Sequence, residues 1–140
     1  MQSSGVFLFN GHGHKTYISC GGGSSSLTRD YVLSQPAGSL SNCRLVVYVA
    51  CLTANGGVGG ANLAQATLDR GAKTVIAFQE SIGVTQSDTW LEGFCQALAG
   101  GSTVQAAGEY AVEYTSQKYD GKMAFTDTWL PFGDSNQRFQ

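Results

Sequence analysis

Two short apolar runs constrain the fold of this chain more than any other feature. The first, "VFLF", covers residues 6–9, and the second, "LVVYVA", covers residues 45–50. Neither run alternates with polar residues, which is typical of strands covered on both faces, as in parallel sheets. The first run gives way to a turn at Asn10 and Gly11, and the second ends at Cys51. We therefore predict two buried strands whose carboxyl ends lead into polar loops.

Strands and helices then alternate along the rest of the chain. "AKTVIAFQ" predicts a third strand, and "KMAFTDTWLPFGD" predicts a last strand with a terminal loop. Apolar residues at helical spacing predict helices over 61–71, 85–101 and 103–119. Residues 15–40, rich in glycine and serine, predict a loop with some local structure. This order favours an α/β fold, a mostly parallel sheet with helices on both faces.

Composition limits the classes of protein to which the chain can belong. With 140 residues, 42% of them hydrophobic and 13% charged, we expect a single domain over 1–140 with a real core. The formal net charge of -2 gives no basic surface for nucleic acid. The sequence shows neither a membrane-spanning run nor a signal peptide, so we expect a cytoplasmic protein with no membrane partner.

The cysteines do not form a recognisable disulfide or metal pattern. The chain has four, Cys20, Cys43, Cys51 and Cys95, and no C-x-x-C pair. Because we expect a cytoplasmic protein, we expect these cysteines to be reduced thiols. His12 and His14 with Cys20 do not match the spacing of zinc ligands, so we predict no metal and no cofactor.

His12 and Cys51 are the candidate catalytic residues. Each follows an expected strand, and ligands of such sheets bind beyond the carboxyl ends of the strands. An imidazole accepts the proton of a thiol and returns one to a leaving amine. The backbone amides of Gly13 and Cys51 are candidate donors to an oxyanion. The alternative is that Cys51 is a buried structural thiol, because free cysteine often packs as a small hydrophobe.

These motifs resemble the caspase-like cysteine peptidases, which include caspases, metacaspases, clostripain-type peptidases and the separase-like CHAT domains. "VFLFNGHG" followed by "LVVYVACLTA" is similar to the histidine strand and the cysteine strand of that group. The succession "GGANLAQATLDRGAKTVIAFQESIGVTQSDTWLEGFCQALAGG" and the closing "WLPFGD" resemble the CHAT type most. The resemblance covers nearly the whole chain.

The resemblance implies a cysteine endopeptidase that hydrolyses polypeptide substrates through a Cys/His dyad. His12 is then the general base and acid, Cys51 the nucleophile, and the amides of Gly13 and Cys51 the oxyanion donors. Members of the group carry further strands before the histidine strand. We therefore expect residues 1–140 to be the C-terminal major part of the fold, lacking the usual N-terminal strands. An upstream fragment or a second copy of the chain is the expected partner at the open edge of the sheet.

Several positions leave alternatives open. Metacaspase-like members carry an acidic residue where this chain has Val49. Glu80 and Asp88, which we place in the loop after the third strand, are therefore the candidates for a charged substrate pocket. The H-G pair favours His12 over His14 as the catalytic base.

Two other functional classes compete with the peptidase hypothesis. One is a non-catalytic caspase-like module for binding or assembly. The other is nucleotide binding at "NGGVGGAN", which lacks the third glycine of G-x-G-x-x-G and the G-K-[ST] of a P-loop.

Overall fold

A four-stranded sheet forms the centre of the molecule. The computed structural model describes residues 5–19 and 26–139. The strand order is β1-β5-β6-β7, with β1 at Gly5–Asn10, β5 at Cys43–Val49, β6 at Thr74–Phe78 and β7 at Trp129–Gly133. β1, β5 and β6 are parallel, and β7 is antiparallel to β6. The sheet is therefore mixed and mostly parallel, as predicted.

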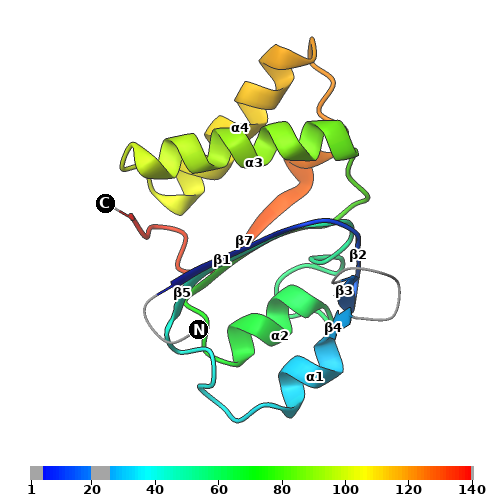
Figure 1. Cartoon of the computed structure of the whole chain (residues 1–140), viewed down its shortest axis with the longest axis vertical. Helices are drawn as coiled ribbons and strands as arrows, with labels where there is room; N and C mark the ends of the chain where they lie inside the picture. The colour runs from blue at the N-terminus through cyan, green and yellow to red at the C-terminus, as the bar shows by residue number, and fades with distance from the viewer. Residues whose placement is uncertain (1–4, 20–25, 140) are drawn as a thin grey trace.

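Helices cover both faces of this sheet (Figure 1). On one face lie α1 at Arg29–Ser34 and α2 at Leu63–Asp69, and on the other α3 at Val84–Ala99 and α4 at Val104–Lys118. A short 3-10 helix, η1 at Thr126–Thr128, leads into β7. The expected α/β architecture is confirmed, with each predicted helix present and a few residues shorter than its sequence pattern.

The surroundings of β5 explain why apolar and polar residues do not alternate along this strand. Val46 and Tyr48 pack into the core on the side of α2, while Leu45, Val47 and Val49 pack into the core on the side of α3 and α4. All five are 2% exposed or less. A strand buried on both faces needs apolar residues at every position, and its end is consequently held rigidly in place.

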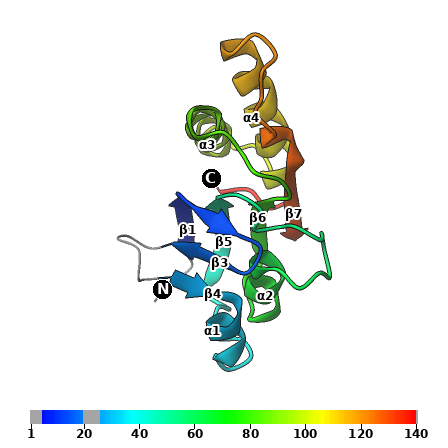
Figure 2. The ribbon, with the colours of Figure 1, turned by 90° about the vertical axis from the view of Figure 1, so that its right-hand side faces the viewer.

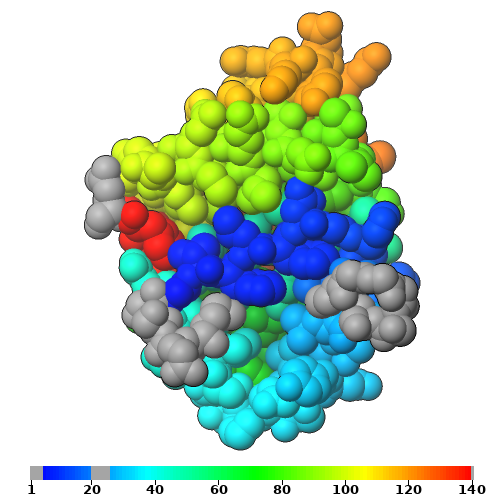
Figure 3. Space-filling model, in the orientation of Figure 1, coloured from blue at the N-terminus to red at the C-terminus, as the bar shows by residue number. Residues whose placement is uncertain are grey.

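β1 differs from the fully buried strand that its sequence predicts. Phe7 and Phe9 pack against the core on the α2 side, but Val6 is 47% and Leu8 43% exposed. The reason is position: β1 is the edge strand, and its residues are visible across the face between α3 and α1 (Figure 3). The expectation of a partner chain at this edge stays a prediction.

A second, small sheet follows β1. It joins β2 at Gly13–His14, β3 at Tyr17–Ser19 and β4 at Ser26–Thr28 in antiparallel pairs. Figure 2 shows it beside one end of the main sheet. The local structure expected within 15–40 therefore consists of β3, β4 and α1, while Cys20 lies outside the described residues. Within 5–19 and 26–139, no helix has the length and apolarity to span a bilayer.

Candidate active site

Strand register brings the two candidate catalytic residues to the same edge of the sheet. Asn10 pairs with Val49 at the carboxyl ends of the parallel strands β1 and β5. His12 follows Asn10 by two residues, and Cys51 follows Val49 by two. Neighbouring strands are about 4.8 Å apart, so both side chains leave the sheet side by side.

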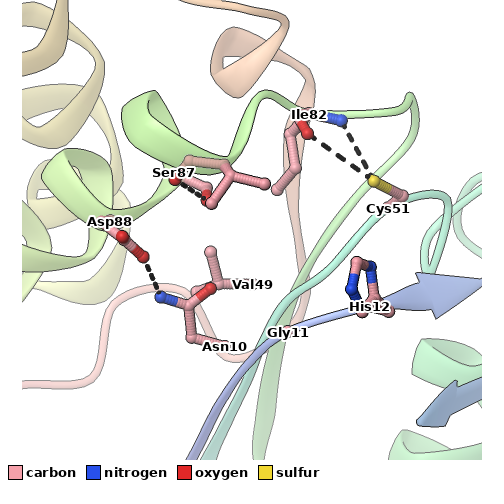
Figure 4. A pocket seen from close by; sticks show the side chains of 9 residues that line it. Asn10, Gly11, His12, Val49, Cys51, Ile82, Ser87 and Asp88 are labelled. Carbon is pink, nitrogen blue, oxygen red and sulfur yellow. Dashed lines mark hydrogen bonds between the residues drawn. The ribbon is translucent and has the colours of Figure 1, made fainter. Parts of the chain in front are cut away.

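A cavity lies where these two loops leave the sheet (Figure 4). Its volume is about 200 Å³ and His12 and Cys51 both line it. The other lining residues come from β1, β5 and the segment that starts α3: Asn10, Gly11, Val49, Ile82, Val84, Ser87 and Asp88. The cavity has an imidazole and a thiol on one wall and a carboxylate on another.

At Gly13 the loop that carries His12, the histidine loop, crosses the loop that carries Cys51, the cysteine loop. A Cβ placed on Gly13 would lie 2.5 Å from Ala50 Cβ and 3.0 Å from the backbone oxygen of Cys51. Only glycine permits so close an approach. The glycine after the histidine therefore has a packing role that the sequence argument did not include: it lets the two loops touch.

The Gly13 amide points away from the small sheet. Ser19 donates its amide to the His12 carbonyl at 3.0 Å, so the next pair, Gly13 with Ile18, is a non-hydrogen-bonded pair of the antiparallel ladder. β2 is also an edge strand. Among the described residues, no hydrogen bond uses the Cys51 amide. Both amides named as oxyanion donors are thus free to take that role.

The segment after β6 holds the cysteine loop by a row of hydrogen bonds. Leu52 donates its amide to the Glu80 carbonyl at 3.1 Å, and Ala54 donates to the Phe78 carbonyl at 2.9 Å. The Asn55 side chain donates to the Gln79 carbonyl at 3.1 Å. Leu52 has a φ of 63°, a left-handed conformation that costs a non-glycine residue about 1–2 kcal/mol. The chain therefore turns sharply, under strain, directly after the candidate nucleophile.

The Cys51 sulfur contacts the backbone of one residue of this segment, Ile82, through two adjacent peptide groups. Ile82 donates its amide to Sγ at 3.3 Å, and Sγ is 3.7 Å from the Ile82 carbonyl oxygen, to which the thiol donates. No hydrogen bond joins His12 to Cys51 among the described residues. Burial raises the pKa of the Cys43 and Cys95 thiols, which makes them poor nucleophiles near neutral pH.

His14 and Glu80 lie outside the cavity. The His14 ring stacks on Tyr17 with centroids 5.2 Å apart, so the structure separates the two histidines that sequence alone leaves as rivals. The Glu80 side chain is exposed, and only its backbone takes part in the loop contacts.

Asp88 lines the cavity, and it does so from α3 rather than from the loop after the third strand. Asn10 donates its side-chain amide to the Asp88 carboxylate. Sequence reasoning missed Asn10, although a polar residue at the end of an apolar strand is the same signal that singled out Cys51.

Three backbone amides of the glycine-rich loop already donate hydrogen bonds within the structure. The amides of Gly57 and Gly60 donate to carbonyls within the loop, and that of Gly59 donates to the Gln65 side chain. The Asn62 side chain donates to the carbonyls of Asn55 and Gly57. These bonds use the groups that a phosphate-binding loop needs, so the arrangement disfavours nucleotide binding.

Comparison with known proteins gives matches at the level of family and fold. The model of the CHAT domain matches residues 3–123. The Arg-specific cysteine proteinase gingipain R has a similar structure, with a TM-score of 0.68 and 21% identity over 95% of this chain and 33% of that one. The complex of the RgpB pro- and mature domains from Porphyromonas gingivalis gives a TM-score of 0.72, with 20% identity over 94% of this chain and 33% of that one. No curated protein sequence matches.

The chain therefore has the α/β fold of these two proteinase chains, with a mostly parallel sheet and helices on both faces. The chain belongs to the CHAT domain family, because that family's model spans most of its length. It covers 33% of the length of each of the two proteinase chains to which its structure is similar.

Replacing Gly13 by alanine tests the crossing of the two loops. The new methyl group meets Ala50 and the Cys51 backbone, which have little room to move, so we expect the free energy of unfolding to fall by about 1–3 kcal/mol. Gly11→Ala is the matched control, because there the methyl group meets only the end of the Phe9 ring, at 2.9 Å. Urea unfolding measures both. Equal stabilities of the two variants would contradict the account of the crossing.

Proposed function

We propose that this chain carries the catalytic centre of a cysteine peptidase, with His12 and Cys51 as its dyad. The observation that carries the proposal is that both side chains line one cavity at the carboxyl ends of neighbouring parallel strands. Thiol and imidazole are the minimal pair for acyl transfer through a covalent intermediate. The cysteine peptidase names of the structural neighbours and the family match support the same chemistry.

The reaction has two stages. His12 accepts the Cys51 proton, and the thiolate attacks the carbonyl carbon of the scissile peptide bond. The C–N bond breaks as His12 protonates the leaving amine, which leaves a thioester on Cys51. A water molecule then gives a proton to His12 and attacks the thioester, and the carboxylate product departs as Cys51 regains its proton.

The amides of Gly13 and Cys51 stabilise the oxyanion of both tetrahedral intermediates. Such donors contribute most when they are already held in place, and each one is typically worth about 100- to 1,000-fold in rate. The Gly13–Cys51 contact supplies that preorganisation, because it fixes one donor loop against the other.

The sulfur and the imidazole have no mutual hydrogen bond among the described contacts. Catalytic hydrogen bonds are often long in the absence of substrate and shorten in the substrate complex. Figure 4 shows the His12 ring on the same side of the cavity as Cys51, and a rotation of the Cys51 side chain about its Cα–Cβ bond would move Sγ away from Ile82.

Substitution of the dyad tests the function directly. We expect Cys51→Ala and His12→Ala to lower the hydrolysis of a mixed peptide library to background, since each removes a group that the chemistry needs. His14→Ala is the control and should keep most of the activity, because His14 stacks on Tyr17 outside the cavity. Circular dichroism verifies that each variant is folded. A folded wild-type chain without activity would favour the non-catalytic binding module instead.

We further propose that Asp88 gives the cavity a preference for a basic substrate residue. Among the described residues that line the cavity, its carboxylate is the only acidic side chain. Asn10 orients it by a hydrogen bond. A lysine or arginine side chain that enters the cavity next to Cys51 places its charge near this carboxylate. One structural neighbour, gingipain R, is likewise described as Arg-specific.

Asp88→Asn tests this preference. Because Asp88 is exposed to solvent, screening limits the charge effect, and we expect kcat/KM for Arg and Lys peptides to fall about three- to fivefold, which corresponds to about 0.6–1 kcal/mol. Cleavage after alanine should not change. Glu80→Gln, a loss of one exposed charge outside the cavity, is the matched control. If the wild type cleaves Arg and Ala peptides equally well, Asp88 does not set the specificity.

A further inference from the structure

The contact between Cys51 and Ile82 has a chemical consequence of its own. Ile82 offers the sulfur both an N–H donor at 3.3 Å and a carbonyl acceptor at 3.7 Å. The two groups favour opposite protonation states. A carbonyl accepts only from the thiol, whereas an N–H stabilises the thiolate. The shorter contact is that of the N–H.

The place of Ile82 in the fold strengthens the effect of its amide. Ile82 directly precedes Gly83, the N-cap of the 16-residue helix α3. The N-terminal end of a helix carries a partial positive charge and favours a nearby anion. The sulfur of Cys51 therefore contacts a backbone donor that lies two residues before the first residue of a long helix.

We propose that the backbone amide of Ile82 is a positioning group that stabilises the Cys51 thiolate before substrate binds. This inference rests on the proposed role of Cys51 as the nucleophile. It adds a donor that the sequence pattern does not indicate, because a backbone group leaves no signature in the residue type. The same peptide holds the sulfur at the cavity wall, and substrate binding and rotation of the side chain release it toward His12.

The segment around Ile82 is held in position by further contacts. Gly83 donates its amide to the Ala124 carbonyl at 3.2 Å. A Cβ on Gly83 would lie 2.7 Å from Ala124 Cβ, so the two segments are in close contact. Leu52 binds the Glu80 carbonyl on the other side. The Ile82 amide is thus presented by a supported backbone, as a preorganised donor requires.

Two ionisable side chains line the cavity together with Cys51, and a third, Glu80, lies outside it on a neighbouring segment. His12 faces the cavity from the loop after β1, Asp88 faces it from α3, and Glu80 belongs to the segment that binds Leu52. Protonated His12 favours the thiolate, and the two carboxylates oppose it. A test of the Ile82 amide must therefore leave all three in place.

The pH dependence of Cys51 alkylation tests the proposal. Iodoacetamide labels the protein at a series of pH values, and mass spectrometric peptide mapping separates Cys51 from Cys20, Cys43 and Cys95. Ile82→Pro removes the N–H, and we expect the rate of Cys51 alkylation at and below neutral pH to fall roughly tenfold, because the thiolate loses a donor. The measurement needs no peptidase activity, so a failure of the proposed function is seen separately.

Two control variants isolate the amide. Ser81→Pro stiffens the same segment at an exposed residue and keeps the Ile82 N–H, and Ile82→Ala keeps the N–H and removes the side chain. Both should reproduce the wild-type profile. If Ile82→Pro does not fold, replacement of Ile82 by its α-hydroxy acid removes the same N–H and should lower the rate of Cys51 alkylation by the same factor. Two results would overturn the proposal. One is a wild-type rate of Cys51 alkylation in a protein that lacks the Ile82 N–H, and the other is an equal loss of rate in Ile82→Ala.

Discussion

The close approach of Gly13 to the Ala50 side chain and the Cys51 backbone is the constraint on which the candidate site depends. β1 and β5 bring the two loops to one edge, but parallel strands alone do not fix how loops beyond them are arranged. A Cβ at position 13 would lie 2.5 Å from Ala50 Cβ. The absence of that atom lets the loop with His12 close over the loop with Cys51, and it leaves the Gly13 amide on an unpaired edge.

The second support of the site comes from the segment after β6. Backbone and side-chain hydrogen bonds join residues 51–55 to residues 78–82, one contact after another along both segments. They hold Leu52 in its left-handed conformation. Strained backbone of this kind persists only where the surroundings determine it, and it is concentrated at functional sites. The loop that carries Cys51, the candidate nucleophile, is therefore supported by the segment with Ile82, and the cavity lies between this segment and the loop with His12.

Sequence predicted the strands and helices well because their patterns are local. The unbroken run 45–50 reports burial on both faces, and the residues after strands 6–9 and 45–50 indicated where His12 and Cys51 lie. The half-exposed faces of Val6 and Leu8 were not predictable in this way. An apolar run does not reveal whether its strand is central or at an edge, and the open edge follows only from the strand order.

The finer parts of the site depend on tertiary contacts that no local pattern reports. Glu80 and Asp88 were equivalent as loop carboxylates, but α3 turns Asp88 into the cavity and leaves Glu80 outside. The Ile82 contact is made by a peptide group, which every residue type carries. His12 and His14 differ because the β2–β3 hairpin stacks His14 on Tyr17.

The acyl-enzyme is the species whose detection tests the peptidase account most directly. The protein is mixed with an arginine peptide ester, quenched with acid within the first turnover, and analysed by intact mass and peptide mapping. The account predicts a mass increase equal to the acyl group, located on Cys51, which disappears as the free acid forms and is absent from Cys51→Ala. A folded protein that hydrolyses the ester with no acyl group on Cys51, or with the acyl group on another cysteine, would contradict it.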